Sequence, residues 1–75
     1  MAPRQLDASE LEALRLFANG KTSDEIAVAL GVSKSMALHY LRVATRKLGG
    51  RSRVHAAALA VEMGLVRTSA REREP

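Results

Sequence analysis

Residues 23–42, SDEIAVALGVSKSMALHYLR, decide the fold of this chain. Small or apolar residues occupy the sites where two helices would meet across a tight turn, namely Ile26, Ala27, Leu30, Val32, Ala37 and Tyr40. Gly31 stands at the turn itself, where the backbone needs a left-handed conformation that glycine adopts easily. This spacing is typical of a helix-turn-helix, whose second helix is built to enter the major groove of DNA.

Four helices are predicted around this motif, over about 8–18, 23–30, 34–48 and 53–63. Each has a residue suited to cap its first turn: Asp7 with Glu10, Thr22 with Glu25, Ser33, and Ser52. The third helix should bury Ala37, Tyr40, Leu41, Ala44 and Leu48. The first should bury Leu11, Leu14, Phe17 and Ala18, and Leu65 with Val66 should fold back onto the core. No strand alternation is present, so the fold class is all-α: a four-helix bundle with a central helix-turn-helix, similar to winged-helix proteins but without a wing.

The chain has 75 residues, which is enough for one small domain. We expect this domain over 1–66 and a charged, disordered tail over 67–75. The absence of cysteine excludes disulfides, thiolate zinc sites and a cysteine nucleophile. We find no phosphate-binding glycine loop and no nucleophile beside a base, so we expect neither an enzyme nor a cofactor or metal site. No apolar run is long enough for a membrane span and no signal peptide is evident, which favours a cytoplasmic protein.

Basic residues concentrate in one part of the chain, whose net charge is +4. They are Lys34, Arg42, Arg46, Lys47, Arg51 and Arg53, with Lys21 just upstream, and no acidic residue interrupts the run from Lys34 to Arg53. The acidic residues lie instead at predicted helix starts and in the tail. A surface with this charge suits a polyanionic partner. From composition alone, the alternative that these charges only keep the chain soluble is equally good.

A set of landmarks in register covers 6–66 without a gap: Glu10, Leu14, Gly20, Glu25, Ile26, Ala27, Leu30, Ser33, Arg46, Lys47, Leu48, Gly49, Arg53, Ala56, Ala60, Gly64 and Leu65. With them the chain resembles the LuxR-type (GerE-type) DNA-binding domain family. The resemblance implies a bacterial, nucleoid-associated domain that reads the major groove with its third helix and often dimerises through its fourth. In most members this domain is the C-terminal part of a larger regulator, and a minority are free-standing.

The chain departs from the family pattern within the third helix. Where the family commonly has Thr-Val-Lys-x-His, this sequence has Met36, Ala37, Leu38, His39 and Tyr40. Met36 replaces a hydroxyl that would approach a phosphate, and Leu38 replaces a lysine that would reach into the groove. The base preferences of the family therefore do not transfer to this chain.

The face of the third helix opposite its apolar stripe supplies the candidate base contacts, which are Lys34, Ser35, Leu38, His39 and Arg42. Arg42 is the first choice, since arginine can donate two hydrogen bonds to guanine, and Leu38 can contact only a thymine methyl or a sugar. The candidate phosphate contacts are Lys21, Thr22, Ser33, Met36, Arg46, Lys47 and Arg51. Alternatively, Arg46 and Lys47 only complement the dipole at the end of their helix.

The fourth helix is apolar on more than one side, and a monomer needs only one of these sides. Ala56, Leu59, Ala60 and Met63 are the candidate interface of a two-fold homodimer. In the alternative, the first helix covers this stripe. The function predicted from the sequence is regulation of transcription through binding of double-stranded DNA. The competing hypothesis is a protein-interaction module that contacts RNA polymerase or another regulator through Met36 and Leu38.

Overall fold

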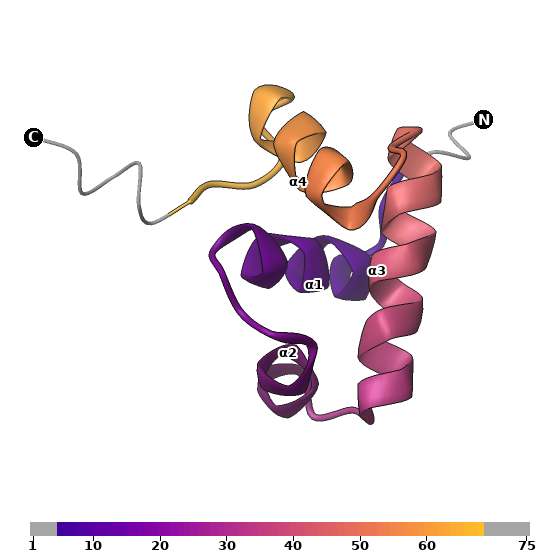
Figure 1. Ribbon diagram of the computed structural model, residues 1–75, viewed down its shortest axis with the longest axis vertical. Helices are drawn as coiled ribbons and strands as arrows, with labels where there is room; N and C mark the ends of the chain where they lie inside the picture. Colours follow the sequence, from indigo (N-terminus) through magenta and orange to yellow (C-terminus); the bar gives the residue numbers. More distant parts are fainter. Residues whose placement is uncertain (1–4, 69–75) are drawn as a thin grey trace, which may run out of the picture.

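The computed structural model describes residues 5–68, and this part of the chain consists of four helices with no strand (Figure 1). They are α1 (Ala8–Ala18), α2 (Ser23–Leu30), α3 (Lys34–Leu48) and α4 (Arg53–Glu62). The predicted all-α class and the four helices are confirmed, although α4 ends one residue early and Met63 is its C-cap. Most of the predicted tail, 69–75, lies outside the described residues.

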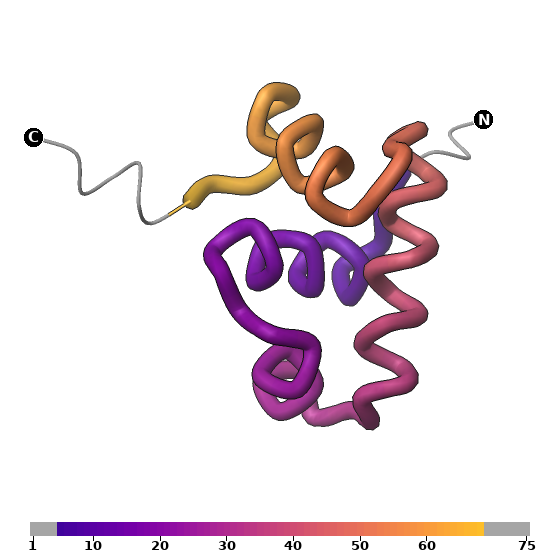
Figure 2. The backbone as a smooth tube through the Cα atoms, in the orientation of Figure 1, coloured from indigo at the N-terminus to yellow at the C-terminus, as the bar shows by residue number. Residues whose placement is uncertain are grey.

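The longest helix, α3, forms one side of the molecule, and the other three pack against it. Along its length lie α4, then α1, then α2, as the path of the backbone shows (Figure 2). The helix α1 also contacts both α2 and α4. The chain therefore encloses α1 on three sides, and one face of α3 remains open to solvent.

All four predicted caps are present. Asp7 and Glu10 form a reciprocal capping box, with the Glu10 N–H donating to Asp7 Oδ1 at 2.9 Å and the Asp7 N–H donating to Glu10 Oε1 at 3.1 Å. Thr22 and Glu25 repeat this arrangement at α2. The hydroxyl oxygens of Ser33 and Ser52 each accept a backbone N–H three residues further on, at 3.1 Å. These bonds satisfy donors that a helix start leaves without a partner.

The turn between α2 and α3 is as tight as the sequence predicts. Gly31 has φ of +70°, which is the left-handed conformation that a residue with a Cβ rarely adopts. Directly after it, the Val32 N–H donates to the carbonyl of Ala27 at 3.0 Å. This turn fixes α3 relative to α2 and leaves Ser33 free to cap the new helix.

The core is aliphatic and rich in alanine. Its buried members are Ala13, Leu14, Ile26, Ala27, Ala37, Leu41, Ala44, Ala56, Ala57, Ala60 and Val66. The predicted stripe of α3 is confirmed, with Tyr40 and Leu48 only partly buried. Such small side chains allow the helices to approach closely.

Two predictions about the core need correction. In α1 Leu14 is fully buried, and Leu11, Phe17 and Ala18 are partly buried against the core, but the buried surface also includes Ala13 and even Glu10. The reason is that α1 packs against three helices, so its buried surface extends beyond one apolar stripe. After α4, Val66 does fold onto the core, but Leu65 remains exposed.

Candidate nucleic-acid interface

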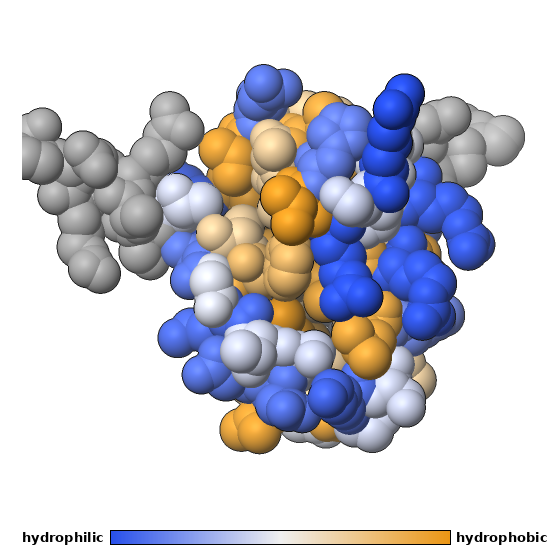
Figure 3. Space-filling view, viewed as in Figure 1, coloured by the Kyte–Doolittle hydropathy of each residue, from blue (hydrophilic) through white to orange (hydrophobic). Residues whose placement is uncertain are grey.

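The open face of α3 carries most of the predicted base contacts. Because Ala37, Leu41 and Ala44 point into the core, the opposite face of the helix is turned to solvent. Lys34, Ser35, His39 and Arg42 are exposed there, and Leu38 is half-buried. In the space-filling view, hydrophilic side chains gather over the side of the molecule that α3 forms (Figure 3).

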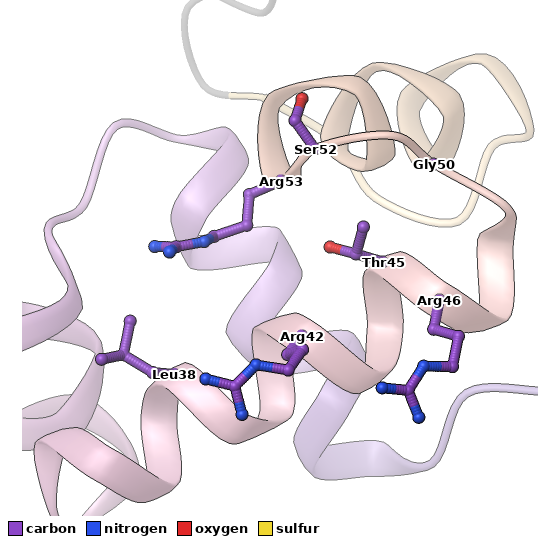
Figure 4. Close-up of a pocket in the computed structure, with 7 residues that line it drawn as sticks. All are labelled: Leu38, Arg42, Thr45, Arg46, Gly50, Ser52 and Arg53. Carbon is purple, nitrogen blue, oxygen red and sulfur yellow. The ribbon is translucent and has the colours of Figure 1, made fainter.

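A groove lies between α3 and the start of α4, and we call it the arginine groove. It has a volume of about 400 Å³ and is lined by Leu38, Arg42, Thr45, Arg46, Gly50, Ser52 and Arg53. The side chains of Leu38, Arg42 and Arg46 come from α3, and Arg53 extends from α4 toward the same space (Figure 4). No acidic side chain lines this groove in the part of the chain that the structure describes.

Arg53 and Thr45 are lining residues that our site prediction omitted. Arg53 is the first residue of α4, yet its guanidinium extends into the groove beside α3 (Figure 4). Two signals in the sequence pointed to Arg53, since it belongs both to the basic run from Lys34 to Arg53 and to the family landmarks. The pattern of residues within α3 could not predict this lining residue, because Arg53 belongs to α4.

The loop before α4 is ordered by its own side chains. The Arg51 N–H donates to His55 Nδ1 at 3.0 Å, and Ser52 caps the helix. Gly50 lies directly against α4, since a Cβ placed on it would be 3.1 Å from the backbone of Ala56. Arg51 and Arg53 are therefore held next to the end of α3.

Two of the predicted phosphate contacts have other partners within the fold. Lys47 turns away from the arginine groove, because its Nζ lies 2.8 Å from Glu10 Oε1 and 3.2 Å from the carbonyl of Gln5. Met36 is exposed, but its thioether has no proton to donate and its backbone N–H already donates to Ser33 Oγ. The Lys47 ammonium is thus directed toward α1, and the Met36 side chain can donate no hydrogen bond.

The remaining predicted phosphate contacts stay on the surface. Lys21, Thr22, Ser33, Arg46 and Arg51 are exposed. The Thr22 and Ser33 hydroxyls accept backbone N–H groups as caps, which leaves each hydroxyl proton free for another acceptor. Lys34 lies 3.6 Å from Asp24, and both side chains are mostly exposed.

The structure also corrects the predicted dimer interface. Ala56 and Ala60 have no exposed surface because α4 packs against both α1 and α3, so the alternative in which α1 covers them holds for these two residues. Of the predicted interface, Leu59 is half-buried and Met63 is 60% exposed. Of the four predicted interface residues, Leu59 and Met63 are therefore the two that keep surface for a second copy of the chain.

Other kinds of site find no support in the described residues. Between residues 5 and 68 no group of three or more His, Asp or Glu side chains could hold a metal ion. None of the helices there has the length and apolar character that crossing a membrane requires.

Comparison with known proteins agrees with the geometry. The family model described as "Bacterial regulatory proteins, luxR family" (GerE) matches residues 4–60. The chain is 40% identical over 57 residues to the transcriptional activator protein PhzR of Pseudomonas fluorescens, covering 76% of this chain and 23% of that protein. It is 38% identical over 61 residues to the HTH-type quorum sensing-dependent transcriptional regulator VjbR of Brucella ovis and of Brucella abortus, covering 81% of this chain and 24% of each. The chain thus spans about a quarter of the length of these relatives.

Proposed function

The chain belongs to the luxR family of bacterial regulatory proteins, and from this premise we propose that it binds double-stranded DNA and regulates transcription. In this proposal α3 enters the major groove. The observation that carries it is the arginine groove, where Arg42, Arg46 and Arg53 converge from two helices with no carboxylate among the lining residues. The two named relatives are a transcriptional activator and a transcriptional regulator, which supports the same role.

Base reading is assigned to the exposed face of α3. Arg42 donates to a guanine, and Lys34, Ser35 and His39 contact neighbouring base edges. Leu38 lies beside the arginines in the same groove, where it can contact a thymine methyl. This apolar residue replaces the lysine common in the family, so we expect a target sequence that differs from those of family members with that lysine.

Phosphate contacts position the domain without reading sequence. We assign them to Lys21 and Thr22 at the start of α2, Ser33 at the start of α3, and Arg46, Arg51 and Arg53 around the end of α3. The N-termini of α2 and α3 favour anions through their dipoles and free amides. Together these groups surround the helix that enters the groove.

A two-fold dimer through α4 completes the proposal. Leu59 and Met63 would form its centre, and two copies would place two α3 helices on half-sites about one turn of DNA apart. The DNA lies in the bacterial nucleoid, so the protein works in the cytoplasm. The competing role is a module that contacts RNA polymerase or another regulator through Met36 and Leu38. It is favoured less because Leu38 lines the arginine groove together with three arginines and no other large apolar side chain.

The deciding experiment selects bound sequences from a random duplex library and then measures affinity by fluorescence anisotropy at several salt concentrations. For a DNA-binding protein, the logarithm of the association constant falls with the logarithm of salt, with a slope of about −0.9 per phosphate neutralised. Arg42→Ala should reduce discrimination at one base position by about 1–3 kcal/mol. Arg46→Ala should weaken all sequences alike and make the slope shallower by about one unit.

Arg15→Ala is the matched control, because Arg15 is an exposed arginine of α1 that pairs with Glu12 and lines no part of the arginine groove. Its binding should equal that of the unmodified protein. If no duplex is bound at about 50 mM salt, where electrostatic attraction is strong, the proposal is wrong and the protein-interaction role replaces it.

A further inference from the structure

The outward face of α2, which would ordinarily be polar, carries an exposed valine, Val28. Ile26 and Ala27 point into the core and Leu30 is half-buried, so these residues complete the packing of α2. Val28, in contrast, is 82% exposed, more than any other large hydrophobic residue in the described chain. The Val28 side chain is therefore not part of the core. An exposed apolar side chain that belongs to a larger apolar surface often marks an interaction site.

Val28 belongs to such a surface. An open groove of about 400 Å³ is lined by Leu16, Lys21, Asp24, Glu25, Val28 and Ala29, and we call it the α2 groove. Leu16, Val28 and Ala29 make it apolar, and the three charged residues form its polar part. The α2 groove shares no lining residue with the arginine groove. Lys21 is the one residue of the α2 groove to which the proposed function also assigns a phosphate contact.

The charge of the α2 groove is opposite in sign to that of the whole chain. Two carboxylates and one ammonium line it, whereas the chain as a whole carries +4. The Thr22 N–H donates to Glu25 Oε1 at 2.9 Å, and this bond lowers the pKa of Glu25, so its carboxylate is ionised at neutral pH. Asp24 lies 3.6 Å from Lys34, but with both side chains largely in water this pair is weak and easily exchanged.

We propose that the α2 groove docks a basic amphipathic segment of another protein. One bulky apolar side chain of that segment covers Leu16 and Val28, and its lysine or arginine residues lie beside Asp24 and Glu25. An amphipathic segment laid into an apolar groove is a common mode of peptide recognition, and complementary charge gives it specificity.

Two other occupants fit the groove less well. A DNA phosphate inside the groove would meet the two carboxylates of Asp24 and Glu25 against the single ammonium of Lys21, so the net interaction would be repulsive. A second copy of this chain, related by a two-fold axis, would bring the same acidic groove against itself, and like charges across an interface are unfavourable. A basic partner avoids both difficulties.

The test uses peptides selected for binding to the full chain from a random library of 12-residue peptides. Selected sequences should share lysine or arginine residues around one large apolar residue. A synthetic peptide of that sequence should shift the backbone amide resonances of Leu16 and of residues 21–29 in a two-dimensional NMR spectrum. Val28→Ser should weaken its affinity about tenfold, as loss of a central interface residue does.

Val54→Ser is the matched control, since Val54 is also strongly exposed but belongs to α4 and lines neither groove. It should bind the peptide as the unmodified protein does. Asp24→Asn should weaken binding several-fold, with a larger effect at low salt. Because Val28 and Asp24 are exposed, thermal unfolding should be unchanged in both variants, which separates lost binding from lost folding.

Three results would overturn the inference. The first is a selected pool that is acidic or that shifts resonances outside the α2 groove. The second is a Val28→Ser variant that binds the peptide as tightly as before. The third is concentration-dependent self-association that Val28→Ser abolishes, since the occupant would then be a second copy of the chain. None of these measurements uses DNA, so their outcome is independent of the DNA-binding proposal.

Discussion

The ammonium of Lys47, in the last turn of α3, lies 2.8 Å from the carboxylate of Glu10, in the first turn of α1. The two side chains are only 27% and 8% exposed, so the pair is largely shielded from water. Glu10 Oε1 also accepts the Asp7 N–H. One carboxylate therefore completes a helix cap and joins two helices far apart in the sequence.

Lys47→Ala is expected to lower the free energy of unfolding by about 1–3 kcal/mol, because it leaves the Glu10 carboxylate buried without its cation. Urea unfolding followed by circular dichroism measures this change. Arg46→Ala is the matched control, since it removes one positive charge from the neighbouring, exposed position and should change stability by less than about 0.5 kcal/mol. Equal losses in the two variants would contradict the assigned role of the pair.

Gly50→Ala should also destabilise the domain. The added Cβ would be 3.1 Å from the N, Cα and Cβ atoms of Ala56, and two of these atoms belong to the backbone of α4 and yield only if the helix shifts. Overpacking of this kind costs about 1–3 kcal/mol. Thermal unfolding compared with the exposed variant Ala58→Ser gives the measurement, and an unchanged midpoint for Gly50→Ala would show that the loop relaxes freely.

Leu38→Ala tests the apolar part of base reading. If Leu38 contacts a thymine methyl as we propose, its removal loses about 0.8 kcal/mol per buried methylene, and each methylene lost lowers the preference for that base about fourfold. Selection from a random duplex library should therefore show weaker thymine preference at one position and an unchanged preference at the position read by Arg42. Identical selected sequences would place Leu38 outside the contact surface.

The stability of α2 should fall in acid. Hydrogen bonding from the Thr22 N–H lowers the pKa of Glu25 below its ordinary value. A carboxyl with a lowered pKa in the folded state stabilises the protein above its unfolded pKa, and this contribution is lost as the pH falls through the folded pKa. Glu25→Gln keeps a capping side chain without the charge, so its stability should vary less than that of the unmodified protein between about pH 3 and 5. If the stabilities of Glu25→Gln and of the unmodified protein changed equally with pH, this role of the Glu25 carboxylate would be contradicted.

The dimer proposal predicts weaker self-association for Met63→Lys. Met63 is exposed after the last turn of α4, where a cation is favourable to the helix dipole, so the variant should fold normally. In a symmetric dimer the two introduced charges would repel each other. Sedimentation at micromolar concentration should show a dimer for the unmodified protein and for Val28→Ser, and a monomer for Met63→Lys. A monomer in all three would rule out association through α4 at these concentrations.

The features that the sequence predicted well are local ones. Ser33, Ser52, Thr22 and Asp7 cap helices through bonds that span three residues, and such bonds can be inferred from neighbouring sequence. The turn at Gly31 is equally local. The apolar stripe of α3 was predictable because its members recur at the spacing of a helix face, while polar and basic residues occupy the opposite face.

The mistakes concern contacts between distant segments. In α4 alanines occur on several sides, so hydrophobic periodicity could not distinguish the buried Ala56 and Ala60 from the exposed Ala58. Arg46 and Lys47, at the end of the third helix, were likewise predicted to have the same role. Only the folded arrangement separates Lys47, which meets Glu10 across the molecule, from Arg46, which remains beside Arg53.

The length of α3 limits how much sequence one domain can recognise. Lys34 and Arg42 are separated by about 12 Å along the helix axis, at a rise of about 1.5 Å per residue. Since base pairs are stacked about 3.4 Å apart, that distance spans roughly four of them. A given sequence of four base pairs occurs by chance roughly once every few hundred base pairs. This is far too often to distinguish one binding site from the millions of competing positions in a genome. The proposed function therefore requires at least two copies of the domain, bound to neighbouring half-sites.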